Sequence, residues 1–477
     1  MNSTQNTFTA DLMQFLDRSP VALLAADNIC RLLAENHYQQ LQEGDSWELQ
    51  PGGRYCVTRN GSAVIAFRIP ANTEAAVSGF HIVASHLDSP TFRVKSNAEI
   101  VIENQYVTLN VEKYGGMILS TWLDRPLSVA GRVLVRTGAG IESRLLNIDQ
   151  DLMIIPSVAI HMNRQVNDGY KWDMKQDLRP LLAGMNDSHS FHSLIARRLG
   201  ISPEDIIDTD LFLYNRQKAS VTGLNGEFLS SGRLDDLQCA YSSLIGFLGS
   251  EQGSSFCSAD SQSARSGVSY ATSGESSAPE APTCATIPVY CALDNEEVGS
   301  MTKQGADSSF LRDTLERISE ALGRSHEDLR RSITSSFMIS ADNAHAVHPN
   351  HPELEDPTHR PVLNGGIVIK YSANQKYTTD AVSGAIMQEL CRIADVPCQL
   401  FYNRSDLLGG STLGNISGTQ LSLNTVDIGL PQLAMHSAYE TAGVRDGEYL
   451  ARVCRVFYSG SLSGNGDGSY QLRFPTI

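Results

Sequence analysis

The chain has 477 residues, 41% of them hydrophobic, so it can bury a large core and is expected to form two or more domains. Acidic residues outnumber basic ones by 53 to 37, and the formal net charge of −16 argues against binding to nucleic acid or to an anionic membrane. The sequence contains no stretch of about 18 apolar residues and begins without a basic segment followed by an apolar one, so we expect neither a membrane span nor a signal peptide.

Nine cysteines are present, at positions 30, 56, 239, 257, 284, 291, 391, 398 and 454, and no two of them form a C-x-x-C pair. Several lie in apolar stretches, as Cys291 and Cys454 do, where a thiol packs like a small hydrophobic group. This usage is typical of a reduced protein rather than of a disulfide framework or a thiolate zinc site. We therefore expect a cytoplasmic protein.

The first candidate ligand follows two helices, which apolar spacing predicts over residues 8–16 and 21–33. A strand over residues 79–85 then ends at His86-Leu87-Asp88. A metal-bound imidazole needs its second nitrogen held by a hydrogen bond, and a carboxylate such as Asp88 often accepts it. Taken alone, the motif fits equally well a histidine that closes a strand and bonds to a local turn.

The pattern changes between residues 94 and 232. Apolar and polar residues alternate with period two in residues 99–103, 106–111 and 132–136, which predicts half-buried antiparallel strands. We predict that residues 94–232 form an inserted, mostly β domain between two parts of a catalytic α/β domain, residues 1–93 and 233–477. His161 lies within this insertion, where composition alone would make it a surface residue.

Asp235 and Asp236 precede a helix whose apolar residues, among them Leu237, Tyr241 and Leu244, form one stripe. Backbone dipoles stabilise a carboxylate at a helix N-terminus, so a simple capping role is the alternative to a ligand role. Two such residues are more than a cap requires.

Residues 249–284 are rich in Ser, Gly and Ala, and we predict a disordered surface loop there because few apolar groups offset its ordering entropy.

An apolar run over residues 287–293 predicts a buried strand, and Asp294-Asn295-Glu296-Glu297 follows it directly. Adjacent carboxylates repel one another unless a cation or a shared proton relieves them. Successive residues of a strand point to opposite sides, so one glutamate can bind metal while the other acts as a general base. The pattern leaves open which does which, and on its own the pair also fits a solvated turn.

Two later strands also end in candidate ligands, because Asp342 follows residues 335–340 and His436 follows residues 426–435. Ligands collect at the carboxyl ends of strands in an open sheet. Imidazole and carboxylate groups without thiolates suit zinc, with manganese or cobalt as substitutes. Two ions would share a carboxylate and could clamp a hydroxide for attack on an amide carbonyl. The candidate residues are His86, Asp235, Glu296, Glu297, Asp342 and His436.

Eight ordered motifs carry a resemblance to a known family. They are His86-Leu-Asp-Ser-Pro90, Glu112-Lys-Tyr-Gly-Gly116, Asp124-Arg-Pro126, Ile160-His-Met-Asn163, Gly232-Arg-Leu-Asp235, Asn295-Glu-Glu-Val-Gly-Ser300, Ser340-Ala-Asp-Asn-Ala-His-Ala-Val-His-Pro-Asn350 and Pro431-Gln-Leu-Ala-Met-His-Ser437. In these motifs and over nearly its whole length the chain resembles the aspartyl aminopeptidase family of dinuclear zinc aminopeptidases, as a bacterial-type member. The resemblance implies an α/β fold with a zinc-exopeptidase-like mixed sheet flanked by helices, and makes the inserted domain a dimerisation or lid domain.

The resemblance also implies roles for individual residues. One metal ion would take His86 and Asp342, the other Glu297 and His436, and Asp235 would bridge them. Glu296 would be the general base, and Asp88 would orient His86. Substrate contacts map onto His345, Lys370, Tyr377 and His161, the last reaching from the inserted domain into a neighbouring subunit's site. The family forms homo-oligomers, commonly tetrahedral dodecamers built from dimers.

The implied function is removal of the N-terminal residue from peptides, with acidic N-termini favoured if Lys370 supplies a local cation. Asn295 stands where some family members have His, and Asp236 stands where many have Asn. Residues 403–410 differ from the form in strictly acidic-selective members. A neutral or broad preference therefore stays open. The same site would also suit a carboxypeptidase or deacylase, and a catalytically inactive scaffold is the alternative from another class.

Overall fold

The structure is a computed structural model that describes residues 3–71, 76–184, 190–250, 284–407, 409–410, 412–464 and 467–474. Most of the segment predicted as a disordered loop, residues 249–284, lies outside the described residues. Within the described part of the chain, no helix has both the length and the apolar character needed to cross a membrane.

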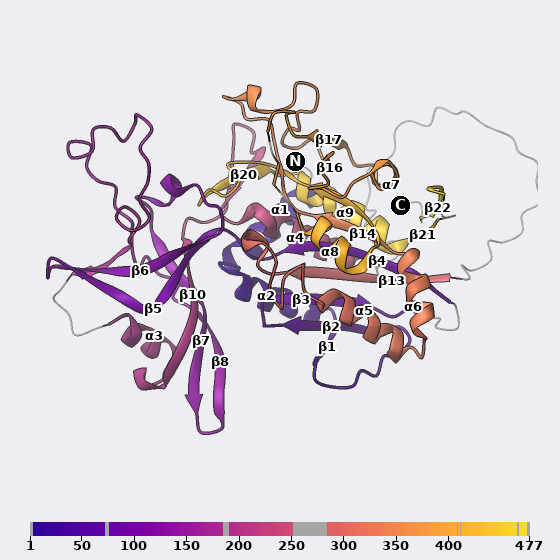
Figure 1. The fold of residues 1–477 in the computed structure, drawn as a ribbon, viewed down its shortest axis with the longest axis horizontal. Helices are drawn as coiled ribbons and strands as arrows, with labels where there is room; N and C mark the ends of the chain where they lie inside the picture. The colour runs from indigo at the N-terminus through magenta and orange to yellow at the C-terminus, as the bar shows by residue number, and fades with distance from the viewer. Residues whose placement is uncertain are drawn as a thin grey trace, which may run out of the picture.

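A nine-stranded mixed sheet forms the centre of the larger part of the molecule (Figure 1). Its strands in spatial order are β1 (Gln39–Leu41), β2 (Arg54–Arg59), β3 (Ala63–Arg68), β13 (Cys284–Leu293), β4 (Ala76–His86), β14 (Phe337–Ala341), β18 (Asn424–Gly429), β16 (Ile367–Tyr371) and β17 (Cys398–Tyr402). The four neighbours β13, β4, β14 and β18 run parallel, with Leu293 paired to His86. Their carboxyl ends therefore meet at one edge of the sheet.

Helices cover both faces of this sheet. One face packs against α1 (Ser3–Arg18), α2 (Ala22–Glu35), α4 (Leu234–Gly249), α7 (Ala381–Ile393) and α9 (Asp446–Ser459). The other face packs against α5 (Phe310–Ala321), α6 (His326–Thr334) and α8 (Leu413–Leu421). Strand β13 serves both layers, because Val289 and Cys291 face one and Tyr290 and Ala292 face the other. The predicted α/β fold, a mixed sheet flanked by helices, is confirmed.

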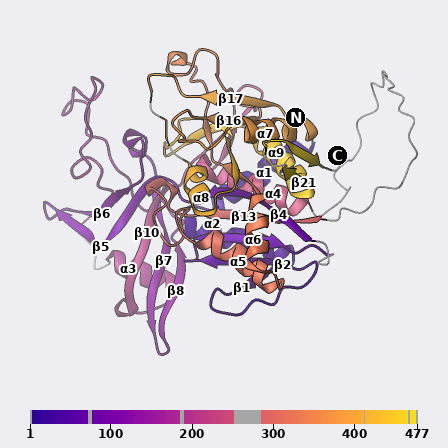
Figure 2. The ribbon, with the colours of Figure 1, turned by 45° about the vertical axis from the view of Figure 1, so that its right-hand side comes forward.

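A six-stranded antiparallel sheet lies beside the nine-stranded one, as both views show (Figures 1 and 2). Its order is β8 (Gly140–Asn147), β7 (Leu127–Thr137), β10 (Ile206–Asn215), β5 (Thr91–Ile102), β6 (Tyr106–Tyr114) and β9 (Leu181–Gly184). It has its own core, which includes Phe92, Val129 and Leu211, and it carries α3 (Phe191–Leu199). The limits 94 and 232 that we assign to an inserted domain stay a prediction.

A third, five-stranded sheet contains short strands next to the candidate ligands. Its order is β11 (Ser220–Thr222), β12 (Phe228–Ser231), β20 (Glu440–Gly443), β19 (Pro431–Leu433) and β15 (Ala344–His345). Strand β12 precedes Asp235, β15 follows Asp342, and β19 precedes His436, so this sheet holds three ligand-bearing segments together. The remaining elements are β21 (Ser461–Gly464), β22 (Tyr470–Arg473) and the 3-10 helices η1 (Leu119–Trp122), η2 (Pro203–Asp205), η3 (Glu296–Val298) and η4 (Pro352–Leu354).

The contact between α4 and α9 gives a stability prediction. A Cβ atom at Gly246 would lie 2.5 Å from the Cβ of Cys454 and 2.6 Å from the carbonyl oxygen of Ala451. We expect Gly246→Ala to destabilise the fold by about 1–3 kcal/mol through overpacking, measured as a lower thermal midpoint. In the control Gly249→Ala, the new Cβ meets nothing nearer than the Cδ of Arg455 at 3.8 Å. Equal midpoints for the two variants would contradict the prediction.

Candidate dinuclear metal centre

The candidate ligands converge at the edge where the parallel strands end. His86 is the last residue of β4, Asp342 follows β14, and Asp235 lies in the first turn of α4. His436 also reaches this site, but the expectation that a strand of the sheet ends at it was wrong. No strand of the nine-stranded sheet leads directly into His436. Strand β18 ends at Gly429, and the chain passes through β19 of the five-stranded sheet before it reaches His436.

Asp235 lies between the two histidines. Its Oδ1 is 3.3 Å from the Nε2 of His86, and its Oδ2 is 3.5 Å from the Nε2 of His436. The Nε2 of His436 is also 3.4 Å from the Oε2 of Glu297, and the Nε2 of His86 is 3.8 Å from the Oδ1 of Asp342. The geometry therefore divides into two groups of ligand atoms with one carboxylate common to both.

The two glutamates do not continue the strand. Strand β13 ends at Leu293, and Glu296 and Glu297 lie in the 3-10 helix η3, after Asn295 in a left-handed conformation. The argument that alternation along a strand separates their side chains was therefore wrong, since a tight helical turn separates them instead. The backbone N–H groups of both glutamates donate to Asp88, at 3.0 Å to Oδ1 and 3.1 Å to Oδ2.

Each imidazole is oriented by a hydrogen bond at Nδ1. The Nδ1 of His86 is 3.1 Å from the carbonyl oxygen of Asp88 and 3.5 Å from its Oδ1. The Nδ1 of His436 is 2.8 Å from the carbonyl oxygen of Gly116. These contacts leave both Nε2 atoms facing Asp235, the arrangement that a metal-binding imidazole needs.

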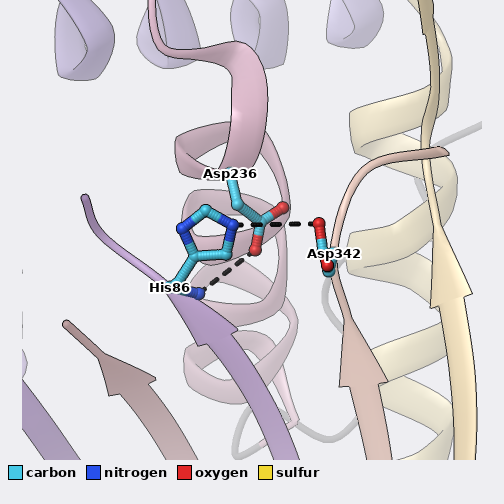
Figure 3. Close-up of side chains that lie close together, drawn as sticks. All are labelled: His86, Asp236 and Asp342. Atoms are coloured by element: carbon cyan, nitrogen blue, oxygen red, sulfur yellow. Dashed lines mark hydrogen bonds and ion pairs between the residues drawn. The ribbon is translucent and has the colours of Figure 1, made fainter. Parts of the chain in front are cut away.

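Asp236 is fully buried, and its carboxylate accepts hydrogen bonds from backbone N–H groups (Figure 3). Its Oδ2 accepts a hydrogen bond from the N–H of His86, and its Oδ1 accepts one from the N–H of Asn343, each at 3.2 Å. His86, Asp236 and Asp342 also lie close enough to form a group that could hold a metal ion. The peptide bond between Asp235 and Asp236 is cis.

Glu440 was not predicted as a site residue, yet it positions two of the candidate ligands. This buried carboxylate accepts hydrogen bonds from the N–H of Asp235 at 3.1 Å and from the N–H of His436 at 2.8 Å. The sequence holds one weak signal for it, an acidic residue four positions after His436. An acceptor for backbone N–H groups has no spacing pattern of its own, so only the folded geometry identifies it.

Burial and mutual repulsion shift the acid–base properties of the site. Burial raises the pKa of Glu296 to about 8 and raises the pKa of Glu297 well above its usual range. Burial also opposes a charge on His436, but Asp235 and Glu297 raise its pKa to about 10. Asp235 behaves in the opposite sense: burial disfavours its charge, yet the neighbouring imidazoles of His436 and His86 hold its pKa below the usual range.

These residues fit bound divalent cations. Among the described residues, the Oδ1 of Asp235 and the Oε1 of Glu297 are buried without a hydrogen-bond donor. Two groups, Asp235–Glu297–His436 and His86–Glu296–Glu297, have ligand atoms near enough to one another to hold an ion. Since buried carboxylates need cations or donors, and since carboxylate and imidazole suit zinc, the donor set matches a zinc centre.

A pocket of about 210 Å³ opens beside this centre. His345, Lys370 and Tyr377, which we predict as substrate contacts, all line it, together with Phe401 and Met435. Lys370 is 2% exposed. Its Nζ donates to the carbonyl oxygen of Asp342 at 2.7 Å and lies 3.8 Å from the Oδ2 of the same residue. The Nζ is also 5.2 Å from the centre of the Tyr377 ring.

His161 is the one predicted site residue that this chain does not bring to the centre. It lies in an exposed turn of the segment between β8 and β9, which extends away from the nine-stranded sheet (Figure 1). Apolar neighbours are exposed with it, including Ile160 at 48% and Met162 at 83%. A role at its own chain's metal centre would require a different conformation of this segment.

A mixed sheet whose strand ends gather histidines and carboxylates around a shared aspartate defines a metal-dependent hydrolase. The family described as "Aminopeptidase I zinc metalloprotease (M18)" matches residues 15–270 and 267–458. A "Probable M18 family aminopeptidase 2" of Clostridium acetobutylicum is 45% identical over 95% of this chain and 98% of its own length. One of Pseudomonas aeruginosa (strain LESB58) is 38% identical over 94% and 97%.

Solved structures agree with this assignment. A chain in the cryo-EM structure of the Ape4 and Nbr1 complex is similar with a TM-score of 0.87 and 33% identity, over 96% of this chain and 86% of that one. The S. cerevisiae mApe1 dodecamer gives a TM-score of 0.78 and 25% identity, over 96% and 99%. The chain belongs to the M18 family of zinc-dependent aminopeptidases, which are metallo-exopeptidases that hydrolyse peptide bonds.

The two adjacent aspartates give a test of the centre. We expect Asp235→Asn to lose at least one of about two bound zinc ions per chain, because a neutral amide cannot replace a shared carboxylate. Asp236→Asn should keep both ions, since Asp236 contacts backbone N–H groups. Zinc content is measured by mass spectrometry after dialysis. Full zinc content in Asp235→Asn, or loss in Asp236→Asn alone, would reverse the two assignments.

Proposed function

We propose that this enzyme removes the N-terminal residue of peptides at a centre in which two divalent ions would share Asp235 as a ligand. His86 and Asp342 would hold one ion, and Glu297 and His436 the other. The observation that carries the proposal is the position of Asp235, whose two oxygens each face a different imidazole. When bound, two such ions supply a Lewis acid for the scissile carbonyl and acidify the attacking water.

Glu296 is the general base of the proposed reaction. Its carboxylate lines the pocket beside the ligands, and burial raises its pKa toward neutrality, to about 8. Glu296 takes a proton from the attacking water and returns it to the leaving amine. Asp88 has a supporting role, because it contacts the Nδ1 of His86 and accepts the N–H of Glu296.

The pocket beside the centre receives the N-terminal side chain of the substrate. Its volume of about 210 Å³ is below that of typical ligand sites, which measure about 300–1,000 Å³. A space of this size suits one side chain and fits an enzyme that removes single residues. Phe401 and Met435 give it apolar walls, while Lys370 gives it a cation.

We also propose that the enzyme works as a cytoplasmic homo-oligomer built from dimers. The cysteines whose side chains the structure describes, Cys30, Cys56, Cys239, Cys291, Cys391, Cys398 and Cys454, all carry free thiols, in keeping with a reducing compartment. The exposed apolar segment around His161 supports a subunit contact, since such a patch marks an interaction site. The similar S. cerevisiae mApe1 is a dodecamer, and His161 would reach a neighbouring subunit's pocket.

Glu296→Gln tests the base assignment. The amide keeps the shape of the side chain but cannot accept the proton, so we expect kcat to fall by about 10²–10⁴-fold. Zinc content should stay at the wild-type value, because Glu297 and not Glu296 is the proposed ligand. Turnover near the wild-type rate in a zinc-loaded variant would rule out Glu296 as the base.

Lys370→Met tests whether this cation selects acidic N-termini. The variant keeps the length of the side chain and removes its charge. Loss of a hydrogen bond to a charged group costs about 1.5–3 kcal/mol, so the ratio of kcat/KM for Asp over Leu substrates should fall by about ten-fold or more. The ratio cancels any loss that both substrates share through Asp342. An unchanged ratio would show that Lys370 does not set the preference.

A further inference from the structure

The last residue of β6, Tyr114, and the two residues that follow it, Gly115 and Gly116, contact the candidate metal centre at three points. The hydroxyl of Tyr114 donates to the Oδ2 of Asp88 at 2.8 Å. Gly115 has a φ of +76°, which favours glycine, and a Cβ atom there would make a tight contact at 3.2 Å from the Cβ of Glu297. The carbonyl oxygen of Gly116 is 2.8 Å from the Nδ1 of His436. A strand of the six-stranded sheet is thus part of the wall of a site whose candidate ligands come from elsewhere.

A continuous chain of hydrogen bonds leads through Tyr114 to the two glutamates. The hydroxyl of Thr302 and the amide of Gln304 donate to the Oδ1 of Asn295, at 2.9 and 2.7 Å. The Nδ2 of Asn295 donates to the Tyr114 oxygen at 2.7 Å. Tyr114 donates to Asp88, and Asp88 accepts the N–H groups of Glu296 and Glu297.

The direction of this chain is determined by the donors and acceptors available. Because the Oδ1 of Asn295 accepts two hydrogen bonds, its amide nitrogen must face Tyr114. The Tyr114 oxygen then accepts from Asn295, and its single proton is left for Asp88. The Tyr114 ring is held edge-on by Phe212 of β10, with ring centres 5.5 Å apart. The six-stranded sheet therefore sets the position of the hydroxyl.

We propose that Tyr114 is a positioning residue, which holds the Asp88 carboxylate so that the turn bearing Glu296 presents its side chain correctly. The proposal rests on the proposed role of Glu296 as base. Asp88, Tyr114, Asn295 and Gln304 all line a cavity of about 420 Å³ behind the site. Asp88 has open space beside it, so its carboxylate is held by hydrogen bonds rather than by close packing, and Tyr114 gives the one side-chain hydroxyl among the donors described above.

Tyr114→Phe removes the hydroxyl alone. We expect kcat to fall by about ten-fold, the lower end of the effect of residues that support metal ligands, while KM stays within about two-fold of wild type. Assays are done at saturating zinc, and zinc content should equal that of the wild type. This combination separates poor positioning of the base from loss of metal or of substrate binding.

Tyr214→Phe is the matched control. Tyr214 is buried where Tyr114 is half-buried, belongs to β10 of the same sheet, and donates a hydrogen bond to Asn147 at 2.8 Å. Both variants lose one hydroxyl that donates a part-buried hydrogen bond, so thermal midpoints should fall similarly, but kcat should fall only in Tyr114→Phe. Equal effects of the two variants on kcat, or loss of zinc from Tyr114→Phe, would reduce Tyr114 to a structural role and overturn the proposal.

A double-mutant cycle with Asn295→Ala tests the chain itself. If Asn295 acts through Tyr114, the double variant should lose no more kcat than the more affected single variant. Multiplying losses would show that the two residues act separately, and the proposal would fail. This coupling does not depend on which glutamate is the base. If Glu296→Gln stays active while the cycle shows coupling, the base assignment fails and the positioning role stands.

Discussion

The structure of the site depends on one constraint, the placing of a buried carboxylate between two imidazoles. Asp235 faces the Nε2 atoms of both His86 and His436, and it is 3% exposed. A carboxylate is removed from water at a large cost unless donors or cations surround it. The two imidazoles meet part of this need, and Glu440 holds the backbone of Asp235 and His436 in place. Two cations would complete the arrangement from the front.

Part of this site could be predicted from the sequence, because the end of a buried strand shows as an apolar run that stops at a polar residue. His86 and Asp342 directly follow apolar strands that run parallel, so their meeting at one edge follows from the fold class. Glu296 lies a few residues beyond such a strand, but the 3-10 turn that carries it is set by contacts with Asp88. No local sequence pattern reveals those contacts between Asp88 and the turn. His436 differs for a related reason, since its approach runs through the five-stranded sheet.

Buried carboxylates in this centre have two different roles that residue type does not distinguish. Asp235 offers its oxygens to the space between the histidines, whereas Asp236 and Glu440 offer theirs to backbone N–H groups. Both uses satisfy the rule that buried polar groups find partners. Adjacent residues such as Asp235 and Asp236 can therefore be assigned from sequence only by resemblance to a family. The contact of Tyr114 with Asp88 is likewise outside any local pattern, because it depends on how two sheets lie against each other.

In the proposed reaction, the pocket would couple substrate preference to metal binding through a single side chain, Lys370. Lys370 is the cation available to an acidic substrate, yet its Nζ also holds the carbonyl oxygen of Asp342 and lies near that residue's carboxylate. Burial opposes the charge of Lys370, and Asp342 nevertheless keeps its pKa above the usual value. A substrate carboxylate would compete with Asp342 for the same ammonium group. If Lys370 selects the substrate as proposed, selectivity for acidic N-termini would be limited by how much of the Lys370 charge Asp342 leaves uncompensated, and the apolar walls would set the preference for neutral residues.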